Sequence, residues 1–253
     1  MYKNILVPLD GSKRAERILP HAVNLAGHFN DGLILVHVVE PHNDFYGSQN
    51  SHKFEAFDDL SQQIKQAKAY LIELKDQLEA EGHHVEDQVV HGNVVRTILR
   101  MAKKFDSGLI AMASHGRTGL SRVFYGNVAA AVLHQVNRPL FIIRAEDDEE
   151  QEWNDVNMYK NILVPLDGSK RAERILPHVE ELALRFGSSV ILLRIVELIG
   201  KSSPLHATLS GFEIENVEQR FDGARSYLAA IQGVFRKKGI QAKAVIKKGP
   251  VVR

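Results

Sequence analysis

The chain of 253 residues contains no cysteine. This absence excludes disulfide frameworks, thiolate zinc sites and catalysis by a thiol, and it suits a reducing compartment. No apolar run approaches the length of about 18 residues that a membrane-spanning helix needs. The first four residues lead straight into a strand pattern, with no charged-then-apolar leader before it. We therefore expect a cytoplasmic protein without a membrane span.

An excess of charge is also missing. The 32 basic and 31 acidic residues give a formal net charge of +1. This balance offers no electrostatic basis for binding nucleic acid or an anionic membrane surface. With 44% hydrophobic and 25% charged residues, the composition is ordinary for a soluble globular protein of one large or two small domains.

Several catalytic and nucleotide-binding signatures are absent. No Gly-x-Gly-x-x-Gly follows the first strand and no Gly-x4-Gly-Lys-(Ser/Thr) occurs, which argues against dinucleotide oxidoreductases and P-loop NTPases. The twelve histidines show neither i,i+4 pairing nor a carboxylate cluster nearby, so core or surface roles are favoured over a metal site. The pair Ser114-His115 lacks a Gly-x-Ser-x-Gly elbow, which disfavours acyl transfer.

The chain contains an internal duplication. Residues 1–21 recur without a change at 158–178, an offset of 157. The offset persists where identity fades, so that Val94-Val-Arg96 matches Val251-Val-Arg253. Counterparts of residues 97–145 are therefore missing from the second copy. Either the chain is a fragment of a longer one, or the protein carries one whole and one partial unit, and the sequence leaves both open.

Residues 145–157 lie between the copies and hold seven acidic and no basic residues, which is typical of a solvated linker. We therefore divide the chain into a first domain over 1–145, an acidic linker over 146–157 and an incomplete second domain over 158–253.

Strand and helix patterns alternate through the first copy. The spacing of apolar residues predicts strands over 2–9, 32–39, 85–90, 108–113 and 139–144, and helices over 12–29, 54–81, 94–104 and 126–136. Pro20 is expected to kink the first helix. Such alternation requires parallel strands joined by right-handed crossovers, so the fold class is α/β with a doubly wound parallel sheet. The second copy supplies three strands of the same kind.

A glycine-punctuated loop follows the strand at 108–113. Gly116, Gly119 and Gly126 have no Cβ, so their backbone N–H groups could approach a phosphate, and a helix would begin at Gly126-Asn127. Arg117 could add a charge-assisted contact. A turn between a strand and a helix would also need one or two glycines, so glycine content alone does not decide.

The first strand ends at Pro8-Leu9, with Asp10 just past its carboxyl end and Ser12 placed to cap the next helix. Ligands of open parallel sheets bind beyond the carboxyl ends of strands where the winding reverses. Asp10 and the loop over 113–127 should therefore converge on one crevice. Asp-Gly is also a common turn dipeptide, which is the alternative for Asp10.

These two stretches together resemble the universal stress protein family. Its ATP-binding members have a strand ending in Val-Pro-x-Asp-Gly-Ser and a loop of pattern Gly-x2-Gly-x9-Gly-(Ser/Thr). Here the first reads Val7-Pro-Leu-Asp-Gly-Ser12, and the second reads Ala113-x2-Gly116-x9-Gly126-Asn127. The spacing is kept, while Ala113 replaces a glycine and Asn127 replaces a hydroxyl residue. The resemblance implies a five-stranded sheet of order 3-2-1-4-5 in the first copy and order 3-2-1, with an open edge, in the second.

The resemblance also implies a site for ATP with Mg²⁺. Asp10 would accept from the ribose hydroxyls, Val38 would meet adenine through its backbone, and the glycine loop would hold the phosphates. The implied binding residues are Pro8, Leu9, Asp10, Val38, Met112, Ala113, Gly116, Arg117, Gly126, Asn127 and Val128.

The leading interpretation is an ATP-binding stress-response module that regulates an unknown protein partner and is not an enzyme, any ATPase activity being slow. One alternative is a dimerisation scaffold of the same fold without nucleotide, for which Ala113 is the clue. Another is a slow adenine-nucleotide hydrolase. By resemblance, the strand over 139–144 would form a homodimer, or an intramolecular pair if the chain is a fragment.

Overall fold

The computed structural model describes residues 3–40, 51–114, 127–144, 159–197 and 211–249, with the side chains of 51–58 and 211–217 excepted. Contacts divide the chain into two compact units, Met1–Asn154 and Asp155–Arg253, hereafter unit 1 and unit 2. The linker expected over 146–157 lies outside the described residues and stays a prediction.

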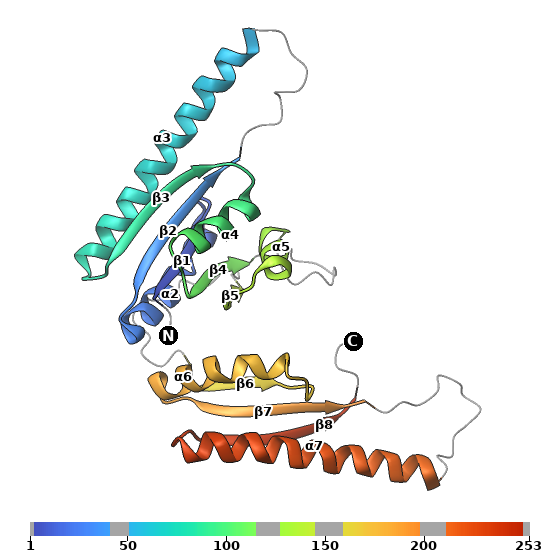
Figure 1. Cartoon of the computed structure of the whole chain (residues 1–253). Helices are drawn as coiled ribbons and strands as arrows, with labels where there is room; N and C mark the ends of the chain where they lie inside the picture. Colours follow the sequence, from blue (N-terminus) through green and yellow to red (C-terminus); the bar gives the residue numbers. More distant parts are fainter. Residues whose placement is uncertain (1–2, 41–50, 115–126, 145–158, 198–210, 250–253) are drawn as a thin grey trace. The chain divides into compact units, whose positions relative to one another are not determined.

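Unit 1 is a five-stranded parallel sheet of order β3-β2-β1-β4-β5, which confirms the expected order (Figure 1). Its strands are β1 (Asn4–Leu9), β2 (Gly32–Val39), β3 (Val85–His91), β4 (Leu109–Ser114) and β5 (Leu140–Arg144). Its helices are α1 (Lys13–Glu16), α2 (Leu19–Phe29), α3 (Ser51–Ala80), α4 (Val94–Lys104) and α5 (Asn127–Gln135).

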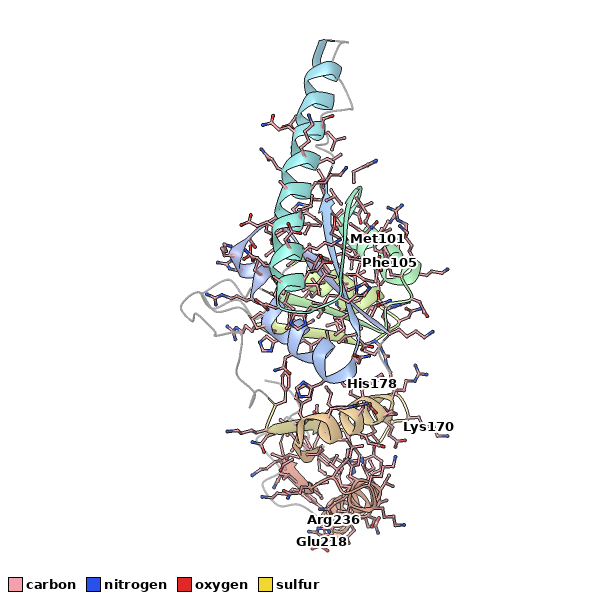
Figure 2. The ribbon with its side chains drawn as sticks, turned by 90° about the vertical axis from the view of Figure 1, so that its left-hand side faces the viewer. Met101, Phe105, Lys170, His178, Glu218 and Arg236 are labelled. Carbon is pink, nitrogen blue, oxygen red and sulfur yellow. The ribbon has the colours of Figure 1, made fainter. Side chains whose placement is uncertain are left out.

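Helices cover both faces of this sheet, as the doubly wound fold requires. The long α3 runs along β2 and β3 on one face, while α4 and α5 lie on the other (Figure 1). Met101 of α4 is buried in the core of the second face, and Phe105 packs against that core (Figure 2). The buried residues of this core are Leu6, Ile34, Val36, Ile98, Met101, Ala102, Ile110, Met112, Ala129 and Val132.

The single helix expected over 12–29 is in fact two, α1 and α2. Pro20 sits in the first turn of α2, where a missing N–H breaks no helical bond. One continuous helix would set the proline ring against the carbonyl of Glu16, four residues earlier, so α1 ends there. The sequence pattern predicted only a kink in one helix, whereas Pro20 marks the start of a second helix. The helix α2 ends at Asn30, which adopts a left-handed conformation at φ 55°.

Unit 2 repeats this architecture with three parallel strands of order β6-β7-β8, as expected (Figure 1). Its elements are β6 (Asn161–Pro165), the 3₁₀ helix η2 (Ala172–Ile175), α6 (Leu176–Phe186), β7 (Ser189–Val196), α7 (Gly211–Lys237) and β8 (Ala242–Lys248). Its core is formed by Val164, Leu166, Val179, Ala183, Val190, Leu192, Leu228, Phe235 and Ile240.

The two copies of the repeated segment have the same register but different surroundings. Asn4 pairs with Gly32 in unit 1, and its counterpart Asn161 pairs with Ser189 in unit 2. Within the described ranges β6 pairs with β7 alone, so the edge that meets β4 in unit 1 has no partner strand there, as the resemblance implied. Leu6 is fully buried, whereas its counterpart Leu163 is 58% exposed.

Candidate functional site

The site lies where the winding of the sheet in unit 1 reverses. β1 pairs with β2 on one side and with β4 on the other. The chain runs from β1 outward to β2 and β3 and returns through α4 to β4 on the other side of β1, so the winding reverses between β1 and β4. The carboxyl ends of these two strands lie at the same edge of the sheet. The structure brings Pro8, Leu9 and Asp10 to this edge together with Met112 and Ala113.

The ladder between β1 and β4 is short. It includes only Ile5 with Leu109 and Leu6 with Ile110, whereas β1 pairs with β2 as far as Leu9. Pro8, which has no N–H to donate, lies in the part of β1 that no longer pairs with β4. The backbones of β1 and β4 are therefore not hydrogen-bonded to each other at the carboxyl edge of the sheet.

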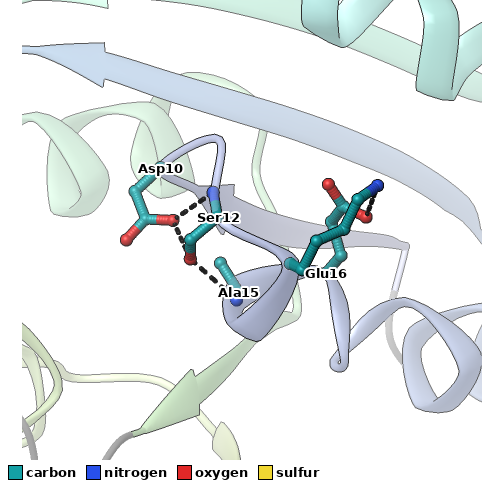
Figure 3. Close-up of polar contacts among 5 residues, drawn as sticks. Asp10, Ser12, Ala15 and Glu16 are labelled. Carbon is teal, nitrogen blue, oxygen red and sulfur yellow. Dashed lines mark hydrogen bonds and ion pairs between the residues drawn. The ribbon is translucent and has the colours of Figure 1, made fainter. Parts of the chain in front are cut away.

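The turn after β1 is held by the Asp10 carboxylate (Figure 3). Oδ1 accepts a hydrogen bond from the Ser12 backbone N–H at 2.9 Å and another from the Ser12 hydroxyl at 2.6 Å. Ser12 Oγ in turn accepts from the Ala15 N–H at 3.1 Å and so caps α1. Gly11 between them has φ 82°, which favours glycine. Asp10 is exposed, and its Oδ2 takes no part in these bonds.

The same turn recurs in unit 2. Asp167 Oδ1 accepts from the Ser169 N–H at 2.8 Å, and Ser169 Oγ accepts from the Ala172 N–H at 3.1 Å. The hydrogen bond from Ser169 holds the pKa of the Asp167 carboxyl below its usual value. The local sequence therefore suffices to form the turn, and the turn interpretation explains one oxygen of Asp10 but leaves the other open.

The side chains at the end of β4 pack into the core or contact β5. Met112 is 6% exposed and belongs to the core under α4 and α5, where Val38 also packs. Ala113, partly buried, pairs with Ile143 of β5. Ser114 is buried, and its hydroxyl donates to the Ile143 carbonyl at 3.2 Å. That bond engages the Ser114 hydroxyl, which further weakens the hypothesis of acyl transfer.

The helix α5 begins after the glycine loop. Asn127 and Val128 open it and are exposed, while Ala129 is buried. Since α5 follows β4, its free N–H groups lie at the carboxyl edge of the sheet, where a helix N-terminus favours an anion. Gly116, Arg117 and Gly126 lie outside the described residues.

Sequence reasoning missed two residues beneath the turn, His37 of β2 and Tyr70 of α3. Their rings meet edge to face with centroids 6.0 Å apart. Burial lowers the pKa of His37, and the Asp10 carboxylate partly offsets this. Burial, followed by the nearby Glu16 carboxylate, raises the pKa of Tyr70. A comparison of the two copies could have found this site, since His37 in the first copy corresponds to Arg194 in the second.

The described residues contain no group of three or more side chains suited to hold a metal ion. Among the helices in that part of the chain, none combines the length and apolar character that crossing a bilayer demands.

The profile of the Universal stress protein family matches residues 1–144 and again 158–252. The chain belongs to this family. A universal stress protein of Methanocaldococcus jannaschii is 27% identical over 149 residues, covering 59% of this chain and 86% of the relative. A second protein of that organism, MJ0577, is 28% identical in its solved structure, with a TM-score of 0.51 over 58% of this chain and 99% of its own.

A universal stress protein structure from Archaeoglobus fulgidus aligns along nearly the whole chain. It covers 98% of this chain and 79% of its own length with a TM-score of 0.66 and 19% identity, which supports the shared fold alone. Family membership, resemblance and fold therefore agree for both units of this universal stress protein.

Proposed function

We propose that unit 1 binds ATP with Mg²⁺ at the edge where β1 and β4 end, and that the bound nucleotide regulates contact with a protein partner. One observation carries the proposal: the Asp10 turn and the start of α5 belong to the two strands that flank the reversal of the sheet. This arrangement offers an acceptor for hydroxyl groups on one side and N–H donors for phosphate on the other.

The side chains suit binding better than fast chemistry. Asp10 Oδ2 can accept from the ribose, while Oδ1 holds the turn. Asn127 can donate its amide to a phosphate. Mg²⁺ would accompany the phosphates and neutralise part of their charge. A carboxylate engaged in its own turn is poorly placed to activate water, so we propose a regulatory module rather than an enzyme, with hydrolysis slow if present.

Calorimetric titration of the 253-residue chain with ATP and magnesium at pH 7.5 tests this proposal. We expect saturable binding of one nucleotide per chain, because the sequence contains one glycine loop for two Asp-Gly-Ser turns. Neither heat nor a thermal shift at millimolar ATP would favour the dimerisation scaffold instead. Release of phosphate from ATP at about 1 s⁻¹ or faster would favour the hydrolase.

Replacing Ala113 with glycine should tighten ATP binding by about 1 kcal/mol, or roughly fivefold, because one methyl group is removed where the family motif has none. The comparison needs a thermal melt of both proteins, since glycine in a strand costs some stability. Unchanged or weaker affinity would mean that Ala113 does not crowd the nucleotide.

We propose that β5 joins two copies of the chain. Within the described residues β5 is the last strand of the sheet and pairs only with β4, and a strand at the edge of a sheet can pair with a strand of another chain. Light scattering at increasing protein concentration should give the mass of a dimer. Proline at Ile142 should shift that mass towards the monomer, whereas a constant monomer mass in the unchanged chain would contradict the proposal.

A further inference from the structure

The two units carry the same turn on different supports. Residues 10–16 and 167–173 are identical in sequence, and in both turns the serine N–H donates to Oδ1 of the aspartate. Beneath the first turn lies His37 of β2, and beneath the second lies Arg194 at the equivalent place in β7. The two turns thus differ in the residue that lies beneath them, a histidine in unit 1 and an arginine in unit 2.

His37 lies next to the turn of unit 1. A Cβ placed on Gly11 would lie 3.7 Å from His37 Cε1, so the space beside this glycine faces the imidazole. His37 is a half-buried residue, and one of its two ring nitrogens, Nδ1, is buried without a hydrogen-bond partner in the described part of the chain.

Arg194 fills the same space in unit 2 with a permanent charge. A Cβ on Gly168 would lie 2.5 Å from Arg194 Nη1, so the guanidinium lies directly against the turn. Its Cζ stands 5.2 Å from the ring centroid of Tyr227, the counterpart of Tyr70. The turn of unit 2 keeps its geometry with this cation beneath it, and Arg194 helps to lower the pKa of the Asp167 carboxyl.

We propose that protonation of His37 gives unit 1 the cation that Arg194 gives permanently to unit 2, and that this charge strengthens binding of an anionic nucleotide at the turn. The affinity half of this inference rests on the function proposed above. The charge half concerns the ligand-free protein and stands by itself.

The sign follows from the surroundings of His37. Burial lowers the pKa of His37 below its ordinary value, so the imidazole gains its proton at a lower pH than a solvent-exposed histidine does. The negative charge of a nucleotide bound across the turn and the start of α5 favours the charged form of His37 and raises its pKa, so by linkage acidification raises the affinity for the nucleotide. A displacement of half to one pKa unit corresponds to a change of roughly threefold to tenfold.

The titration of other charged groups near His37 must be distinguished from that of His37 itself. The turn presents Asp10, α1 presents Glu16 paired with Lys13 at 2.8 Å, and α3 presents Tyr70. On β3 the register partner is Val89, and the residues on either side of it along that face are Asp87, which pairs with Lys75, and His91. Carboxyl groups ordinarily titrate near pH 4 and tyrosine near pH 10. The control is therefore a substitution of His91, the other imidazole on this face.

The first experiment follows backbone amides of the ligand-free chain by NMR between pH 5.5 and 7.5. We expect the chemical shift of the Ser12 amide to change with pH, with the same midpoint as the titration of the His37 imidazole. The chemical shift of the Ser169 amide should not change with that midpoint. His37→Asn should abolish the movement, His91→Asn should keep it, and Arg194→His should confer it on Ser169. A static Ser12 amide, or movement that survives His37→Asn, overturns the inference.

The second experiment compares ATP affinity at pH 5.5 and 7.5. Protonation of the ATP phosphates is the same for every variant, so it cancels when pH ratios are compared. From pH 7.5 to pH 5.5 we expect the affinity for ATP to rise about threefold to tenfold more in the unchanged chain than in His37→Asn. In His37→Arg, whose charge is permanent, the ratio of the affinities at the two pH values should equal that of His37→Asn. Equal ratios in all three proteins overturn the affinity half, whereas absence of binding at both pH values overturns the proposed function and the affinity half with it.

Discussion

Leu6→Ala is expected to destabilise unit 1 by about 3 to 5 kcal/mol, the usual cost of truncating a fully buried leucine. Leu6 is 0% exposed and packs between the sheet and the helices α4 and α5. Truncation would leave a cavity among side chains such as Ile34 and Ile110, which are fixed by two strands and cannot collapse freely onto it.

The repeat supplies a matched control for this substitution. Leu163 occupies the same position in an identical stretch of 21 residues but is 58% exposed, so Leu163→Ala should cost less than about 1 kcal/mol. Hydrogen exchange distinguishes the units if it is followed in β4 and β7, whose sequences differ, rather than in the repeated strands. Equal losses of protection in the two variants would contradict the burial described for the two units.

Asp10→Ala should weaken ATP binding by roughly 10- to 150-fold, which corresponds to the loss of a charge-assisted hydrogen bond of about 1.5–3 kcal/mol. The substitution removes the acceptor proposed for the ribose and also the bonds that hold Ser12. Asp10→Asn separates these effects, because an amide oxygen can still accept from the Ser12 N–H but carries no charge.

Asp167→Ala is the corresponding control in unit 2. It removes the same turn bonds to Ser169, in a part of the sequence that has no counterpart of the loop over 113–127. Titration calorimetry should therefore find ATP affinity unchanged in Asp167→Ala and reduced in Asp10→Ala. If both variants bind as tightly as the unchanged chain, Asp10 is a turn residue and nothing more.

Much of the fold was predictable from local patterns. Continuous apolar runs such as Leu33–Val36 mark strands buried on both faces, and the apolar stripe of α3, with Leu71, Leu74 and Leu78, marks an amphipathic helix. The alternation of these patterns forces parallel pairing. The order of the strands, by contrast, came from the resemblance to universal stress proteins, since alternation is compatible with several orders.

The candidate site was only partly predictable. The position of Asp10 after a strand and Ser12 before a helix indicated the turn. Nothing in the spacing indicated that the Ser114 hydroxyl is occupied by the Ile143 carbonyl, or that His37 lies under Gly11 against Tyr70. These contacts join residues between 26 and 33 positions apart, and they depend on which strands are neighbours.

The duplicated segment separates what the sequence by itself determined from what only the tertiary structure decided. Residues 10–16 and 167–173 form the same turn with the same bonds in both units, because the carboxylate, the glycine and the serine hydroxyl act within a few residues of one another. Leu6 and Leu163 have the same neighbours in sequence but opposite burial. The burial of a side chain depends on the elements that pack over it from elsewhere in the chain, and α4, β4 and α5 do so in unit 1.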